Sequence, residues 1–178
     1  MNHFQSLKTL SYVQVRRILR IWIQTIIPPA ITTALYFLIF GELIGSRIGE
    51  MPGYEGLTYL EFMVPGLIML AVITNSYANV ASAFFGAKFQ KAIEEILISP
   101  MANWAILLGF IVGGIARGVL VGVVVVLVSL FFTNFGISNV FLTLFSILLT
   151  STLFSILGLI NGMYAKTFDD ISIVPTFV

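Results

Sequence analysis

The chain has 178 residues, of which 58% are hydrophobic and 10% are charged, and its formal net charge is +1. Soluble domains carry about 25% charged residues, so this composition excludes a soluble globular protein and indicates a membrane protein. The near-neutral charge gives no indication of nucleic-acid binding. The sequence has no cysteine and a single histidine, His3, so it offers no thiolate nucleophile, no disulfide and no histidine-based metal site.

Residues 1–20 predict an amphipathic helix in front of the first long apolar run. Tyr12 and Leu19 belong to an apolar stripe at helical spacing, whereas Arg16 and Arg20, four residues apart, face elsewhere. Such a helix lies in the headgroup plane of a bilayer. The sequence leaves open whether this interfacial helix is a simple anchor that sets the topology or a functional elbow.

Four apolar runs are long enough to cross a bilayer, which takes about 20 residues. Only the third run contains a charged residue, Arg117. A further apolar run begins at Ile171, and we expect 171–178 to be the start of a fifth span in a longer protein. The predicted fold is an all-α integral membrane protein with an interfacial helix at its N-terminus. The four complete predicted spans are 21–40, 62–85, 104–132 and 140–163.

Basic residues gather on one side of the predicted spans. Seven of them precede the first span, lie between the second and third, or follow the fourth, whereas Arg47 lies on the other side in an acidic loop at 41–61. Basic residues mark cytoplasmic loops, so we expect a cytoplasmic N-terminus, with the loop at 41–61 and the segment 133–138 outside. The seven residues are Lys8, Arg16, Arg17, Arg20, Lys88, Lys91 and Lys166.

The third and fourth predicted spans carry stripes of small residues. Gly114, Gly118 and Gly122 recur every fourth residue in the third span, and Ser155 and Gly158 belong to a similar stripe in the fourth. Small residues let two helix backbones approach closely in a membrane. The stripes therefore predict tight helix packing, either within one subunit or between two, and do not by themselves indicate a pore.

Polar residues in the second and third spans are the candidate pathway residues. Asn75, Asn79 and Ser82 are spaced to share one face of the second span, where they either join helices or line a substrate path. Arg117 lies thirteen residues past Trp104, deep in the third span, and none of the four predicted spans contains an acid to pair with it. Backbone carbonyls, water or an anionic lipid would each satisfy its charge, so structural and functional roles both stay open.

Four charged residues gather in the segment 88–99, between the second and third spans. The segment predicts a short cytoplasmic helix in which Lys91 and Glu95 form an i,i+4 pair on the polar side. Ser99 is suited to cap the following helix and Pro100 to occupy its first position. A short helix joined rigidly to two spans transmits force to both, although a charged helix that merely rests on the membrane surface is the simpler alternative. The predicted apolar face consists of Phe89, Ile93, Ile96 and Leu97.

The second span opens with YLEFMVPGLIM, in which Tyr59, Phe62, Pro65 and Gly66 match a Y-x-x-F-x-x-P-G pattern. This motif and two later ones, in this order, resemble those of ABC-2 type transporter permeases, and most closely the YadH-like inner-membrane permeases of that family. The segment FQKAIEEILISPM resembles the coupling helix of the family, and GLINGMYAKTFDDISIVPTFV resembles the cytoplasmic turn before its fifth span. The resemblance runs from about residue 16 to the end.

This resemblance implies six spans in the whole protein and a separate ATPase subunit that binds ATP and Mg²⁺. The chain itself has no G-x-x-x-x-G-K-[ST] loop, so we expect a permease without catalytic residues or cofactors of its own. By resemblance, two permeases and two ATPases form an exporter in the bacterial inner membrane, and the helix at 88–99 sits in a cleft of the ATPase. The implied interface residues are Phe89, Lys91, Glu94, Glu95, Ile96 and Pro100.

Other classes of membrane protein fit the sequence less well. An ion-driven secondary transporter usually carries acids within its spans, and an intramembrane enzyme needs a nucleophile with a base or a set of metal ligands. The sequence shows neither feature. A secondary transporter and a structural scaffold nevertheless stay open as alternatives, and dependence of activity on an ATPase separates the permease from both.

Overall fold

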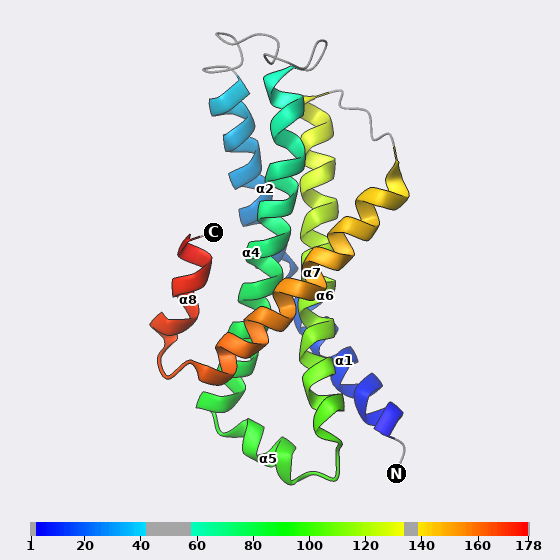
Figure 1. The fold of residues 1–178 in the computed structure, drawn as a ribbon, viewed down its shortest axis with the longest axis vertical. Helices are drawn as coiled ribbons and strands as arrows, with labels where there is room; N and C mark the ends of the chain where they lie inside the picture. The colour runs from blue at the N-terminus through cyan, green and yellow to red at the C-terminus, as the bar shows by residue number, and fades with distance from the viewer. Residues whose placement is uncertain (1–2, 42–57, 134–138, 178) are drawn as a thin grey trace.

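Backbone polar groups in lipid must be satisfied within the chain, and the apolar runs of this sequence meet that demand as helices. The computed structural model of the chain describes residues 3–41, 58–133 and 139–177. The predicted external segments fall largely outside the described residues, and their location stays a prediction. The all-α architecture is confirmed (Figure 1). The helices are α1 (His3–Arg20), α2 (Trp22–Leu38), α4 (Tyr59–Phe89), α5 (Ala92–Ile98), α6 (Asn103–Phe132), α7 (Val140–Tyr164) and α8 (Phe168–Phe177).

Four of these helices are long and apolar enough to cross a membrane, as the sequence predicts. The first of these candidate spans covers Trp22–Gly41, and α6 and α7 match their predicted spans to within one residue. α4 is longer than predicted at both ends, because it begins at Tyr59 and continues to Phe89. Its start is fixed by Thr58, whose backbone N–H donates to the carboxylate of Glu61 (2.9 Å).

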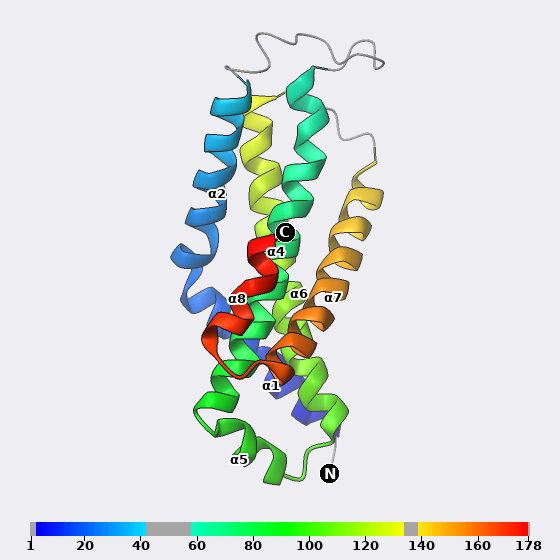
Figure 2. The same ribbon diagram turned by 60° about the vertical axis from the view of Figure 1, so that its left-hand side comes forward.

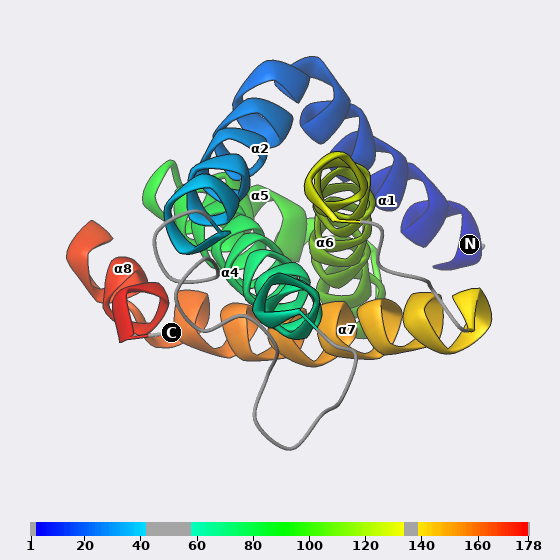
Figure 3. The ribbon, with the colours of Figure 1, turned by 90° about the horizontal axis from the view of Figure 1, so that it is seen from above.

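α4 and α6 lie side by side as the middle layer of the bundle (Figure 3). α1 and α2 cover this layer on one side, and α7 crosses it obliquely on the other (Figure 1). α8 rises beside α4 from the end of the bundle that holds α5 (Figure 2). Because α2, α4, α6 and α7 alternate in direction, α1, α5 and the α7–α8 turn all share that end.

Two apolar clusters hold the middle layer to its neighbours. One joins α2, α4, α6 and α7, and the ring of its member Phe37 stacks on the exposed ring of Phe132 with centroids 5.4 Å apart. The other joins α4, α5, α6 and α7; it contains Ile93 and the edge-to-face pair of Phe84 and Phe110, with centroids also 5.4 Å apart. Within a bilayer, such clusters stabilise the bundle through van der Waals packing, since lipid tails are as apolar as the side chains.

The predicted stripes of small residues are contacts between helices of this one chain. A Cβ atom at Gly118 of α6 would lie 3.0 Å from Cβ of Ser76 on α4 and 3.1 Å from Cβ of Ser151 on α7. A Cβ atom at Gly158 of α7 would lie 2.5 Å from the carbonyl oxygen of Tyr77 on α4. Of the two alternatives, the structure shows packing within one subunit. The glycines of α6 that approach α4 and α7 in this way are Gly114, Gly118 and Gly122.

α1 confirms the predicted N-terminal helix and packs along α6. Gln14 is buried, and a Cβ atom at Gly109 of α6 would lie 2.5 Å from Cδ2 of Leu10. The predicted apolar stripe faces away from the bundle, since Tyr12 and Leu19 are both exposed. An exposed apolar stripe beside membrane-crossing helices is the surface that an interfacial helix presents to lipid.

The run predicted as the start of a fifth span forms α8, which begins at Phe168, three residues earlier than predicted. The carboxylate of Asp170 causes this early start, because it accepts hydrogen bonds from the backbone N–H groups of Lys166 (2.9 Å) and Thr167 (3.0 Å). These bonds favour the charged carboxylate and hold the pKa of Asp170 below its usual range. In return, the hydroxyl of Thr167 accepts from the N–H of Asp170 (3.3 Å), a donor that the first turn of a helix leaves free.

The contact at Gly158 can be tested by adding one methyl group. We expect Gly158→Ala to lower the free energy of unfolding by about 1–3 kcal/mol, because the new Cβ must displace the α4 backbone. Gly86→Ala is the matched control, since a Cβ at Gly86 meets no atom within 4 Å. Thermal unfolding in one detergent measures both variants, and a Gly158→Ala protein as stable as the control would contradict the close approach.

Candidate functional site

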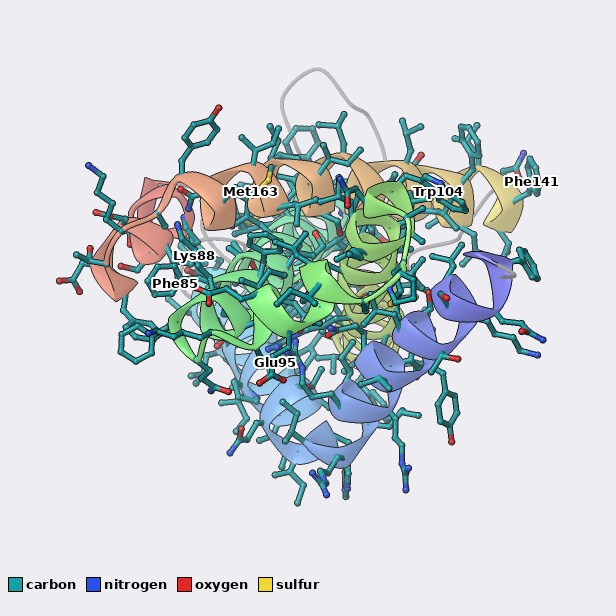
Figure 4. All side chains as sticks on the ribbon, turned by 90° about the horizontal axis from the view of Figure 1, so that it is seen from below. Phe85, Lys88, Glu95, Trp104, Phe141 and Met163 are labelled. Carbon is teal, nitrogen blue, oxygen red and sulfur yellow. The ribbon has the colours of Figure 1, made fainter. Side chains whose placement is uncertain are left out.

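α4 and α6 are both longer than a bilayer is thick, and α5 joins their ends. With 31 and 30 residues they are each about 45 Å long, against about 30 Å for the hydrocarbon core. The excess lies at the α5 end, because α2 and α6 are level at the opposite end, where Phe37 stacks on Phe132. Figure 4 shows the α5 end from below, with Glu95 on the connecting helix.

A tight corner at Lys91 ends α4 and starts α5. Lys91 has a φ of 58°, the one positive φ at a non-glycine residue in the described part of the chain. Its N–H bonds to the carbonyl of Lys88 (3.1 Å), and a left-handed residue at this place terminates a helix. The predicted helix over 88–99 is therefore wrong at its start. The predicted i,i+4 pair of Lys91 and Glu95 is wrong too, because Lys91 precedes the first turn of α5.

The far end of α5 also differs from its prediction. Ser99 ends α5 and does not start α6, since its N–H bonds to the carbonyl of Glu95 (3.2 Å) and its hydroxyl donates to the carbonyl of Ile96 (2.5 Å). α6 begins at Asn103. Pro100 consequently lies in the connecting segment and not in the first turn of α6. Ala102 holds the position before the first turn of α6, so Ser99 lies three residues too early to cap that helix.

α5 buries one side and exposes an acidic and apolar surface on the other. Ile93 is buried in the cluster with α4 and α6, as predicted. Glu94 and Glu95 are exposed, and no ion pair is recorded for either carboxylate within the described residues. Leu97 and Ile98 are 56% and 84% exposed, so within the predicted apolar face Ile93 is buried and Leu97 is not. Two carboxylates beside two exposed apolar side chains form a surface suited to a protein partner.

Phe89 belongs to α4, at the corner itself, and not to the short helix. Its ring meets the ring of Phe168 on α8 with centroids 5.2 Å apart, and Phe168 meets Phe85 edge-on at 4.8 Å. Phe89 is still 68% exposed. This aromatic cluster joins the end of α4 to the start of α8, so a displacement of the corner also acts on α8.

Lys88 fastens the same corner to the end of α7. Its Nζ donates hydrogen bonds to the carbonyl oxygens of Met163 (2.9 Å) and Ala165 (3.0 Å), and Figure 4 shows it beside the α7–α8 turn. The last carbonyls of a helix have no partner within the helix, and a cation there is stabilising. The α4–α5 corner therefore contacts both the end of α7 and the start of α8.

The structure separates the three polar residues that the sequence places on one face of α4. Asn79 is buried, and its side-chain oxygen accepts a hydrogen bond from Nη2 of Arg17 on α1 (3.2 Å). Asn75 lies beside a cavity of about 430 Å³ between α2 and α4, opposite Pro28. Ser82 is exposed. Asn79 thus joins helices, whereas Asn75 borders a cavity between two of them.

Arg117 is partly buried on α6, and its Nε is buried without a hydrogen-bond partner among the described residues. The positive charge of Arg17 on α1 repels the guanidinium group of Arg117. Gly114 and Gly118, on the neighbouring turns of α6, contact α4 and α7 and are packing residues. Among the described residues no group of three acidic or histidine side chains could hold a metal ion.

Comparison with known proteins identifies the family of this chain. Residues 5–178 match the sequence profile of the family described as ABC-2 type transporter. The chain belongs to the ABC-2 type transporter family. Its relatives include the proteins named "Inner membrane transport permease YadH" of Escherichia coli (strain K12) and Shigella flexneri. Each is 53% identical to this chain over 176 residues, which cover 99% of the chain and 68% of the relative. No solved structure matches the chain.

In this ABC-2 family member, sequence reasoning missed part of the surface of α5. Ile96, expected at the partner interface, packs partly against the inner cluster, whereas Pro100 is exposed. Ile98 is the exposed apolar residue that the sequence did not single out, and Leu97, placed on the apolar face, is exposed as well. One signal was present: three consecutive apolar residues cannot share one face of a two-turn helix, so some of them must point outward.

The corner at Lys91 can be tested through its backbone conformation. A left-handed conformation costs a non-glycine residue about 1 kcal/mol and a β-branched residue more. We therefore expect Lys91→Gly to unfold at the same or a higher temperature than the parent, and Lys91→Val to unfold at a lower one. Thermal unfolding of the two variants, which both lack the lysine charge, measures the difference. Equal unfolding temperatures would show that the left-handed corner is not formed.

Proposed function

We propose that this chain is the transmembrane permease subunit of an ATP-driven exporter in the bacterial inner membrane. In this proposal two copies of the permease work with a separate ATPase subunit, which binds ATP and Mg²⁺. Membership of the ABC-2 type transporter family supports it, as does the name of the YadH relatives, "Inner membrane transport permease". Export is the direction that the family resemblance implies.

The observation that carries the proposal is the position of α5. Its surface offers Glu94, Glu95, Leu97 and Ile98 to a partner, while Ile93 fixes it to the bundle. The helix connects the protruding ends of α4 and α6, which are packed against each other along their length. Binding of ATP would draw two ATPase subunits together, and their movement would displace α5 together with α4 and α6.

The distribution of charge supports a cytoplasmic location for α5. α1, the α4–α5 corner and the α7–α8 turn share one end of the bundle, and they carry all seven of the cations on which the orientation rests (Figure 1). Basic residues favour the cytoplasmic side. An ATPase in the cytoplasm would therefore reach α5, and the N-terminus would lie on the same side.

The cavity between α2 and α4 is the place where a substrate group would enter the pathway. Its wall combines hydroxyl and amide groups with apolar side chains, and Thr32, Thr74 and Asn75 supply the polar atoms. Such a mixed lining suits an amphipathic substrate. In an exporter the same groove would open and close as α4 moves relative to α2.

Charge reversal on α5 tests the coupling role. We expect Glu94→Lys and Glu95→Lys, singly and together, to weaken the complex with the ATPase encoded beside the gene, because each reversal changes the surface charge by two units. The protein is purified in detergent with that ATPase, and the amount of ATPase retained and the rate of ATP hydrolysis are measured. Asp169→Lys is the matched control, an exposed acid at the same end but on α8.

The outcomes separate the permease from its alternatives. Loss of ATPase from the α5 variants but not from the control would support the coupling helix. If both charge reversals leave assembly with the ATPase and ATP hydrolysis unchanged, α5 is not part of the interface with the ATPase. If no ATPase binds the parent protein, an ion-driven carrier or a scaffold becomes the better account.

A further inference from the structure

Three helices bring two arginines to one junction inside the bundle. A Cβ atom at Gly113 of α6 would lie 3.0 Å from Cβ of Gln14 on α1 and 3.7 Å from Nδ2 of Asn79 on α4, so the three helices meet there. Arg17, one turn after Gln14, donates from Nη2 to Oδ1 of Asn79 (3.2 Å). Arg117 lies one turn after Gly113, and the charge of Arg17 acts on it.

The two positive charges lack a compensating anion in the described part of the chain. No ion pair is recorded for either arginine, and Nε of Arg117 is buried without a hydrogen-bond partner. Burial also lowers the pKa of Arg17 from its ordinary value, which reflects the cost of removing the guanidinium from water. The described carboxylates belong to other places, namely the start of α4, α5 and the start of α8. They are Glu61, Glu94, Glu95, Asp169 and Asp170.

The junction lies at a membrane boundary and not at the centre of a span. α2 and α6 run side by side in the same direction, and Phe37 of α2 stacks on Phe132 of α6. Phe37 is 15 residues beyond Trp22, and Phe132 is 15 residues beyond Arg117. Arg117 is therefore level with the first residue of α2, where the first candidate span begins. The sequence-based expectation instead placed Arg117 deep in the third span.

We propose that Arg17 and Arg117 bind the phosphate group of an anionic lipid at this boundary, with Asn79 positioning the Arg17 guanidinium. Guanidinium groups bind phosphate through paired N–H donors, and a phosphate would neutralise two charges that otherwise repel each other. Headgroup phosphates lie at this level of a bilayer, and anionic lipids are enriched on the cytoplasmic side.

This lipid site is independent of the proposed transport function. Its occupancy can therefore be measured in the absence of any ATPase. The purified chain in a non-ionic detergent is titrated with phosphatidylglycerol, and bound lipid is counted by native mass spectrometry. We expect the double variant Arg17→Gln, Arg117→Gln to bind phosphatidylglycerol at least about tenfold more weakly than the parent. The matched double variant Arg16→Gln, Arg20→Gln removes two exposed charges from α1, and we expect its affinity to stay within about twofold of the parent.

Further arms of the experiment identify the ligand and exclude a purely structural role. Phosphatidylcholine and inorganic phosphate are titrated in the same way, and tight binding of inorganic phosphate alone would assign the site to a soluble anion and overturn the lipid assignment. Equal losses of phosphatidylglycerol affinity in the two double variants would show that binding depends on general surface charge, and would overturn the proposed site. Without lipid, Arg117→Gln removes a buried unpaired charge, so its unfolding temperature should not fall. A fall in that temperature with unchanged lipid binding would make Arg117 a structural residue only.

Discussion

The close approach of α6 to α4 and α7 is the contact on which the rest of the structure depends. Glycines at 114, 118 and 122 leave room for side chains of the neighbouring helices, and Gly158 brings α7 against the backbone of α4 at Tyr77. Lipid supplies no hydrophobic drive for helices to associate, so dense van der Waals contact must hold them together. α4 and α6 consequently behave as a packed pair, and α1, α2 and α7 take their places around that pair (Figure 3).

Because α4 and α6 form a packed pair, a force on the short helix α5 would move both of them together. α5 connects the two members of the pair beyond the bilayer, and the left-handed corner at Lys91 sets its direction. Lys88 fastens this corner to the end of α7, and the rings of Phe89 and Phe168 join it to α8. A force on α5 would therefore reach the membrane-crossing helices as a group, which is the property that the proposed coupling requires.

The length and apolar character of the runs were enough to predict the four candidate spans, because a helix that satisfies its own backbone is the solution lipid permits. The charged segment between them was recognisable for the same reason, since charges interrupt an apolar run. The exact limits of that segment could not be predicted, because the left-handed conformation of Lys91 depends on tertiary packing. Glycine would be expected at such a position. Likewise, the pairing of Arg17 with Asn79 joins residues 62 positions apart, and no local pattern encodes it.

Access to α5 in the assembled complex tests the central claim most directly. The chain has no cysteine, so a single introduced thiol is a unique reporter. Ile98→Cys places the thiol on the exposed side of α5, and Tyr164→Cys places it at the exposed end of α7 as a control. Labelling by a water-soluble maleimide is measured with and without the ATPase. The account predicts that the ATPase protects the thiol on α5 and leaves the thiol on α7 equally reactive; equal labelling on α5 in a complex that retains the ATPase would contradict it.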